Sequence, residues 1–299
     1  MSIINTCSHC AVCNAILSVD NDSKEHVILE AIGGHLKVKG FVCMSCNNNT
    51  GSTWDAQLAA QLLPLNHLFG ATRQRGTTPE LPITTTDGEK LTMKPEGGFV
   101  PSKPSFSEIN TEDGVKIEIT ARTMKEAKGI LAGVHRKYPN INIEQILENA
   151  QVSSSYPTGM VHHELNFGGE VSGRAIVKSV LAFAHYTGVP IELCSDAIQY
   201  LRDSAAPPCF GYYHATDLIS NRPAETPLHC VGIQTNPKTG LILGYAEYFG
   251  VQRVVVCLGK NYSGEIVQSC YAIDPRTGEE LNLSVHLDFN QDEIDAIYN

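Results

Sequence analysis

We expect this chain to adopt an α+β fold, with a small N-terminal module followed by a larger mixed α+β domain that contains an antiparallel sheet. Three observations point to this class. Four cysteines stand in two Cys-x-x-Cys pairs near the N-terminus, a strong amphipathic helix pattern covers residues 169–188, and four strand-like segments follow the Pro207–Pro208 break. We place the boundary between the module, residues 1–70, and the larger domain, residues 71–299, where threonine, proline and glycine become frequent.

The two cysteine pairs have the spacing of a structural metal site. Each pair is followed by a turn signal, so each can form a knuckle, and four thiolates from two knuckles make the closed tetrahedral site that suits zinc. A segment this short cannot bury enough apolar surface to fold alone, and a bound zinc ion supplies on the order of 10 kcal/mol. The predicted ligands are Cys10, Cys13, Cys43 and Cys46.

The first knuckle has an alternative register. Cys7 and Cys10 also form a Cys-x-x-Cys pair, and His9 is a further candidate ligand. We favour Cys10 with Cys13 because a strand-like segment, residues 15–19, follows this pair directly.

Composition limits the classes of protein to which the chain can belong. Hydrophobic content of 42% and charged content of 18% are ordinary for a globular chain, and no window reaches the roughly 18 apolar residues of a membrane span. Ten cysteines without a signal peptide indicate a reducing cytoplasm, where paired thiols bind metal more often than they form disulfides. We expect ordinary buried thiols at Cys194, Cys209, Cys230, Cys257 and Cys270. The net charge of −10 argues against a large surface that wraps nucleic acid, but it is compatible with a small site that uses local cations.

The N-terminal segment predicts a hairpin followed by a helix. The expected extended segments and turn are residues 15–19, 26–28, 33–34 and 41–42. Helical spacing begins after Cys46 and continues to Leu63, and Pro64 should end the helix there.

The rest of the chain predicts groups of helices and strands. The expected helices are residues 123–138, 142–150, 169–188, 195–204 and 290–299. The expected strands are residues 81–86, 90–95, 116–121, 229–236, 240–250, 252–259 and 266–274. The last four strands have the spacing of an antiparallel meander.

The residues between and after the cysteine pairs form a second motif. They read Glu25-His26-Val-Ile, then two glycines, then Cys-x-x-Cys-Asn47, with a glycine and an aspartate in the following helix. This pattern resembles the HNH (ββα-metal) endonucleases, and is most similar to their zinc-knuckle branch, over residues 7–63. The resemblance implies a hairpin and a helix that hold one divalent ion, while the cysteines hold a separate structural zinc.

The resemblance also implies a role for each polar residue of the motif. His26 would be the general base that activates water, Glu25 and Asn47 would bind a catalytic Mg²⁺ or Mn²⁺, and Asn48 is the alternative to Asn47. The chemistry agrees with these roles. Imidazole titrates near neutral pH, oxygen ligands suit hard cations, and a divalent cation stabilises the charge that develops during phosphodiester cleavage.

The chain departs from the family pattern at two positions. Leu29 stands where the family usually has proline. The middle asparagine of the motif has no match, so His35 or Lys37 would take its place. Both departures bear on catalysis more than on the fold.

Several polar residues outside the motif have ordinary interpretations. Arg174 and Lys178, one turn apart on a predicted helix, could contact phosphate, but a solvated helix edge is the default expectation. His162 and His163 are expected in a loop or strand rather than at a metal site.

The sequence therefore predicts a metal-dependent endonuclease that hydrolyses phosphodiester bonds, with DNA favoured over RNA as substrate. A single site of this kind nicks one strand, so double-strand cutting would need two copies, as in a homodimer. A cytoplasmic nuclease of restriction or phage defence fits this description. The alternative is a non-catalytic zinc-knuckle protein that binds nucleic acid or another protein. In the nuclease, residues 71–299 would select the target, sense a signal or form an oligomer.

Overall fold

The computed structural model describes residues 9–112, 114–151 and 153–298. The fold is mixed α+β with antiparallel sheets, which confirms the predicted class. Among the described residues, no helix combines the length and the apolar composition that a membrane span requires.

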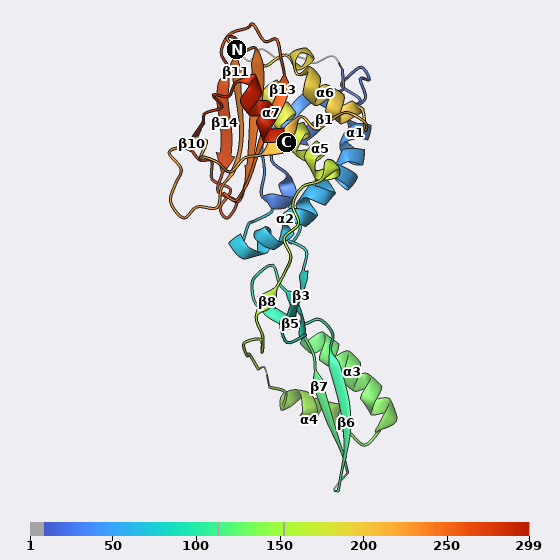
Figure 1. The fold of residues 1–299 in the computed structure, drawn as a ribbon. Coiled ribbons are helices and arrows are strands. Elements are labelled where there is room, and N and C mark those ends of the chain that lie inside the picture. The colour runs from blue at the N-terminus through green and yellow to red at the C-terminus, as the bar shows by residue number, and fades with distance from the viewer. Residues whose placement is uncertain (1–8, 113, 152, 299) are drawn as a thin grey trace. The chain divides into compact units, whose positions relative to one another are not determined.

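The chain forms two compact units. The first unit combines Met1–Thr78 with Leu165–Asn299, and the second unit is Pro79–Glu164, so the second is an insertion in the first (Figure 1). This division differs from the boundary predicted after residue 70, because side chains of the N-terminal segment and of the C-terminal sheet share one hydrophobic core. The role assigned to residues 71–299 stays a prediction.

The first unit is built on a five-stranded antiparallel sheet in the order β14-β11-β12-β13-β9. The strands are β9 (Phe210–Tyr212), β11 (His229–Asn236), β12 (Leu241–Tyr248), β13 (Gln252–Gly259) and β14 (Gln268–Ile273). β11, β12 and β13 form a meander as predicted. β14, however, pairs with β11, so the fourth strand returns to the opposite edge instead of following β13.

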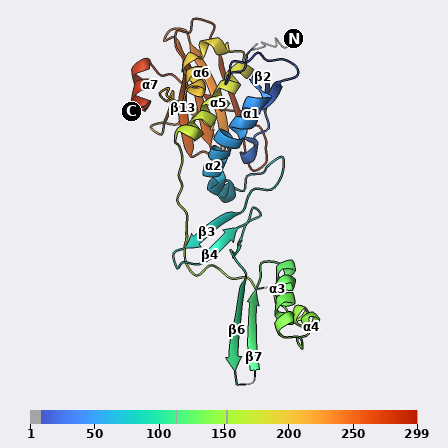
Figure 2. The same cartoon turned by 90° about the vertical axis from the view of Figure 1, so that its right-hand side faces the viewer.

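Both faces of this sheet are covered. Helices α5 (Glu170–Tyr186) and α6 (Ser195–Arg202) lie over one face, and α7 (Gln291–Tyr298) lies over the other, as does the ribbon of β10 (Ile219–Ser220) and β15 (Ser284–Val285) (Figure 2). Side chains that alternate along β12 therefore enter two separate cores. Gly244 lets α5 approach closely, because a Cβ there would lie 2.1 Å from Val180 Cγ1.

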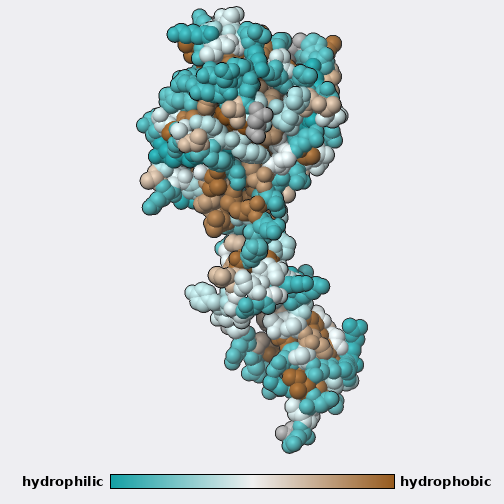
Figure 3. Space-filling model, viewed as in Figure 1, coloured by the Kyte–Doolittle hydropathy of each residue, from teal (hydrophilic) through white to brown (hydrophobic). Residues whose placement is uncertain are grey.

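The N-terminal segment forms a hairpin and one long helical rod on the α5 side. β1 (Asp22–His26) pairs with β2 (Lys37–Cys43), and the 3₁₀ turn η1 (Glu30–Ile32) lies between them. The rod consists of α1 (Met44–Thr50), the π-helical turn η2 (Gly51–Asp55) and α2 (Ala56–Phe69). On the face drawn in Figure 3 the first unit is mainly hydrophilic, and hydrophobic side chains gather over α2.

The strand predicted at 15–19 is wrong. These residues make one isolated bridge, between Ile16 and His9, and Val19 is almost fully exposed. β2 pairs with residues 22–26 instead, which leaves the earlier segment without a partner strand.

The predicted stop at Pro64 is also wrong. α2 continues to Phe69, because Leu65 and Asn66 are buried and the fixed φ of proline is compatible with a helix. Burial thus outweighs the one backbone hydrogen bond that proline cannot make.

The second unit contains a small sheet, a ribbon and two helices. The sheet is β5 (Phe99–Pro101), β4 (Lys90–Met93), β3 (Leu81–Thr85) and β8 (Val161–His162) in that order. The ribbon is β6 (Ser105–Thr111) with β7 (Gly114–Thr120), and the helices are α3 (Met124–Lys137) and α4 (Ile143–Glu148). The Thr123 hydroxyl accepts the N–H of Glu126 over 3.2 Å and so caps the first turn of α3.

The Gly33–Gly34 turn needs both glycines. Gly33 ends η1 in the left-handed region, with φ of 99°. Gly34 passes so close to Ile28 that a Cβ would lie 1.9 Å from the Ile28 carbonyl oxygen. The turn therefore fixes the path of the chain immediately after His26.

A buried histidine of the sheet holds this turn in place. His229 Nε2 lies 3.0 Å from the carbonyl oxygen of Ile32, and the Phe249 N–H donates to His229 Nδ1 over 3.2 Å. This pattern assigns the neutral tautomer with the proton on Nε2. Burial lowers the pKa of His229 to about 3, so the ring stays neutral over the physiological range.

Substituting Gly34→Ala should destabilise the first unit by about 1–3 kcal/mol, because the new methyl group forces the backbone of Ile28 to move. Gly51→Ala is the matched control, since a Cβ at this helical glycine meets only Asp55 Oδ2, at 4.0 Å. The control should stabilise the protein by up to about 1 kcal/mol. Urea unfolding measures both, and equal stabilities for the two variants would contradict the close contact.

The pH dependence of stability should include a contribution from His229. Its pKa is about 3 in the folded chain and about 6.5 when unfolded, so only the unfolded state takes up the proton as the pH falls below about 6.5. Wild-type stability should decrease by up to about 1.4 kcal/mol per pH unit from this group. His229→Gln keeps a donor for Ile32 but cannot titrate, so its deficit relative to wild type should shrink between pH 7.5 and 5. A deficit that is constant across this range in urea unfolding would argue against the assignment.

Candidate metal centre and active site

The four cysteines of the two Cys-x-x-Cys pairs come together. All four Sγ atoms lie within 4.8 Å of one another, and all four thiols are free: Cys10, Cys13, Cys43 and Cys46. Among the described residues no other set of three or more histidine, cysteine and acidic side chains converges in this way. Cys7, the alternative ligand, lies outside the described residues.

The cluster has the dimensions of a zinc site. Zinc–sulfur bonds of about 2.3 Å give a tetrahedron with edges of about 3.8 Å. The Sγ atoms of Cys13 and Cys43 are 3.7 Å apart. The Cys43 N–H donates to Cys10 Sγ over 3.4 Å, and the Cys46 N–H donates to Cys43 Sγ over 3.5 Å. These bonds favour thiolates, so the four residues fit a structural zinc ion.

Both knuckles are fixed by their surroundings. Cys43 is the N-cap residue of α1, so the second pair begins the helical rod. The first knuckle turns at Asn14, whose N–H donates to the Cys10 carbonyl over 2.9 Å. Arg202 of α6 donates from Nε to the carbonyl of Ala11 over 2.9 Å and from Nη2 to that of Cys10 over 3.1 Å. The C-terminal part of the chain thus holds the first knuckle.

Glu25 is buried and paired with a lysine from α5. Its Oε1 lies 2.8 Å from Nζ of Lys178, which also lies 2.7 Å from Asp55 Oδ2 and 3.2 Å from Thr50 Oγ1. The ammonium group therefore directs its three donors to three acceptors. The side chain of Lys178 is completely buried.

Burial and charge oppose each other in this cluster. Burial raises the pKa of Glu25 to about 7, against the lowering effect of Lys178, and Asp55 adds to the rise. Burial also raises the pKa of Asp55. For Lys178, burial favours the neutral amine, but the two carboxylates outweigh it and raise the pKa. The result is one buried cation held between two acidic groups.

Asn47, Gly51 and Asp55 follow one another at intervals of about one turn along the helical rod. Asn47 Nδ2 donates to Ser23 Oγ over 2.6 Å and to the carbonyl of Lys24 over 3.3 Å, so its amide is bound to β1. Gly51 leaves space between the two polar side chains. The π-helical turn that begins at Gly51 places Asp55 against Lys178.

This region contains oxygen atoms of the kind that can bind a hard divalent cation. The second carboxylate oxygen of Glu25 and the amide oxygen of Asn47 are of the type that hard cations prefer. Asp55 Oδ1 is a further oxygen of this kind, buried and without a hydrogen-bond partner among the described residues.

His26 ends β1, directly opposite Lys37 of β2. In the described part of the chain its Nε2 is buried without a hydrogen-bond partner. Burial, together with the positive charges of Lys37, Lys178 and Arg75, lowers the pKa of His26 to about 4, against the raising effect of Glu30. The imidazole is therefore neutral at pH 7, which is the form that accepts a proton.

The two candidates for the missing middle asparagine differ in position. Lys37 lies in register with His26, whereas His35 packs edge-on against Tyr271 and lies 3.6 Å from Glu280. Lys37 is the better placed of the two. A hollow of about 290 Å³ lies beside the Gly33–Gly34 turn. It is lined by Gly33, His35, Thr72, Arg73, Gln74, Thr277 and Gly278.

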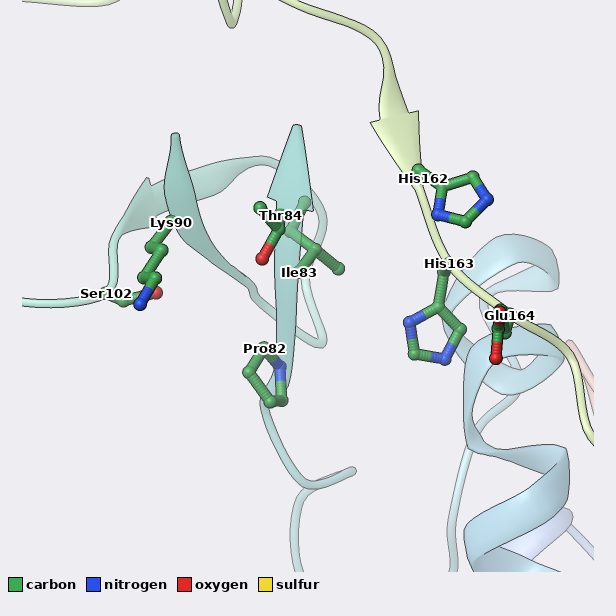
Figure 4. A pocket seen from close by; sticks show the side chains of 8 residues that line it. All are labelled: Pro82, Ile83, Thr84, Lys90, Ser102, His162, His163 and Glu164. Atoms are coloured by element: carbon green, nitrogen blue, oxygen red, sulfur yellow. The ribbon is translucent and has the colours of Figure 1, made fainter. Parts of the chain in front are cut away.

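The second unit has a hollow of its own, of about 370 Å³, which holds the neighbouring histidines His162 and His163 (Figure 4). Their rings point to different sides of the chain, and these histidines belong to none of the converging metal-ligand groups found among the described residues. His162 ends β8, as the strand interpretation predicted.

Sequence reasoning missed the role of two cations. Lys178 and Arg174 were expected on a solvated helix edge, but both are buried. Arg174 donates to the Tyr200 carbonyl and pairs with Glu170 over 2.7 Å. Only the unusual number of small and apolar neighbours on this helix signalled that its charges are enclosed.

Purified protein should carry one zinc ion per chain, measured by plasma mass spectrometry. Cys43→Ser should lose the zinc and fail to fold, because the ion supplies on the order of 10 kcal/mol. Cys270→Ser removes a half-buried thiol elsewhere and should keep the zinc. A soluble, folded Cys43→Ser variant with full zinc content would contradict the assignment.

Comparison with known proteins agrees with this part of the structure. A family model described as HNH endonuclease matches residues 10–63, which contain both cysteine pairs together with Glu25, His26 and Asn47. Searches of curated proteins and of solved structures returned no significant match. Residues 10–63 are thus similar to the HNH endonuclease family, both by the match to its model and by the four-cysteine cluster.

Proposed function

We propose that the protein is a metal-dependent endonuclease that hydrolyses phosphodiester bonds of DNA, with His26 as the general base. The observation that carries the proposal is the unpartnered Nε2 of a neutral His26, directly after Glu25 and beside the helix that bears Asn47. The HNH family match at residues 10–63 supports a nuclease-type activity.

In this reaction His26 takes the proton from the attacking water. Its pKa of about 4 is low for a general base. A bound phosphodiester carries a negative charge, which offsets the effect of Lys37 and Arg75 and raises the pKa of His26 toward neutrality. The same two cations attract the substrate to this face.

Glu25, through its free oxygen, and Asn47 would hold a divalent Mg²⁺ or Mn²⁺ ion. When bound, such an ion stabilises the charge that develops on the phosphate and on the leaving oxygen. The zinc ion on the four cysteines would be structural, because its thiolates leave no open coordination position.

A non-catalytic zinc-knuckle protein that binds nucleic acid is the second candidate. The pairing of Glu25 with Lys178 favours it, because one oxygen of the expected metal ligand is already occupied. Both candidate functions include a structural zinc ion and binding to nucleic acid. They differ in whether the bound nucleic acid is cleaved.

Incubation of supercoiled plasmid with the protein and Mg²⁺ or Mn²⁺ should produce nicked circles. His26→Ala should reduce the rate by about 10²–10⁴-fold, since it removes the general base. His286→Ala, at an exposed histidine, is the control and should cleave as wild type does. Structured RNA in a parallel reaction decides between the two substrates.

Cleavage that survives in His26→Ala would overturn the assignment of the base. Retained DNA binding without cleavage by wild type, with zinc present, would support the second candidate. Dimer formation, a cytoplasmic location and a role in restriction or phage defence stay proposals that rest on this activity.

A further inference from the structure

A lysine that is distant in sequence, 123 residues after Asp55, reaches into the proposed metal site. Lys178 belongs to α5, yet its Nζ lies 2.8 Å from Glu25 Oε1 and 2.7 Å from Asp55 Oδ2. These are distances at which an ammonium group occupies the space between two carboxylate oxygens. Its third donor is directed at Thr50 Oγ1, 3.2 Å away, so no direction is left for substrate.

The geometry points to Lys178 as a built-in cation of the nuclease site, a positioning residue rather than a catalytic one. It occupies the space between Glu25 Oε1 and Asp55 Oδ2, so a divalent ion would have to be held by the remaining oxygens, those of Glu25 and Asn47 next to His26. This inference rests on the proposed function, and it assigns to α5 a part in the site that the segment 10–63 does not contain.

The positive charge of Lys178 affects how tightly the site binds a divalent ion, which a purely structural ion pair elsewhere would not do. A fixed positive charge beside Glu25 weakens the attraction of the site for a second cation. Removing the charge should therefore strengthen the binding of a divalent ion. Cleavage should fall at the same time, because the ion is no longer confined beside His26.

The test compares Lys178→Met with Arg174→Met. Both replace a buried cation of α5, but only Lys178 contacts Glu25 and Asp55. Zinc content and circular dichroism first establish that each variant is folded. Mn²⁺ binding is then measured by electron paramagnetic resonance, and plasmid nicking is measured on the same samples.

Lys178→Met should bind Mn²⁺ about tenfold or more tightly than wild type, as expected for loss of one unit charge near the ligands. It should nick at least tenfold more slowly, and Arg174→Met should bind Mn²⁺ as wild type does. If Lys178→Met does not fold, the double variant Lys178→Met/Asp55→Asn replaces it. Because that variant keeps the formal charge of the cluster at −1, it should bind Mn²⁺ no more tightly than wild type, and tighter binding by it would contradict the charge argument.

Equal or weaker Mn²⁺ binding in folded Lys178→Met would overturn the inference, whether or not the wild type cleaves DNA. Absence of Mn²⁺ binding by the wild type would also overturn it. Tighter binding in a protein whose wild type cleaves no nucleic acid would support the cation role of Lys178 and contradict the proposed nuclease function. Mn²⁺ binding therefore tests the cation role of Lys178, and plasmid cleavage tests the proposed nuclease function.

Discussion

The buried ammonium group of Lys178 is the interaction on which the N-terminal part of the structure depends. One charge joins the first strand, the helical rod and α5, because it contacts Glu25, Asp55 and Thr50 at once. Without it, two carboxylates would be buried side by side, and breaking a buried pair costs about 3–5 kcal/mol. The same side chain therefore sets both the packing of the segment 10–63 against α5 and the electrostatics of its buried carboxylates.

The segment around the cysteines is also held by contacts that have no metal in them. Arg202 binds the carbonyls of the first knuckle, and His229 binds the turn that follows His26. The hairpin and the helical rod contribute side chains to the core beneath α5. A zinc ion on the four cysteines would thus be one of several constraints on this segment, although its short length first suggested that the metal alone would make it fold.

The parts that sequence could predict are those that depend on neighbours in the chain. Two Cys-x-x-Cys pairs each set a local turn, so their meeting in one cluster followed from spacing, and the helix at 169–188 followed from its apolar period. The buried position of Lys178 could not be predicted in this way. Its partners lie in a different part of the chain, and its own helix pattern shows only that a charged residue is present. Pro64 and the return of β14 were missed for the same reason, since burial and strand pairing are set by distant residues.

The insertion of the second unit leaves two connections that the first unit must hold in place. The chain leaves the first unit after Thr78 and returns at Leu165. Close to this return, Gln61 of α2 exchanges two hydrogen bonds with the backbone of Gly168, of 2.8 and 3.0 Å. These bonds close the first unit at the base of the insertion, at a residue that lies two positions before α5 begins and ten positions before Lys178. The two bonds tie α2 to the residues that lead into α5, whereas the segment that leads out to the second unit is held separately, by the hydrogen bond from the Thr72 N–H to the Pro275 carbonyl over 2.9 Å.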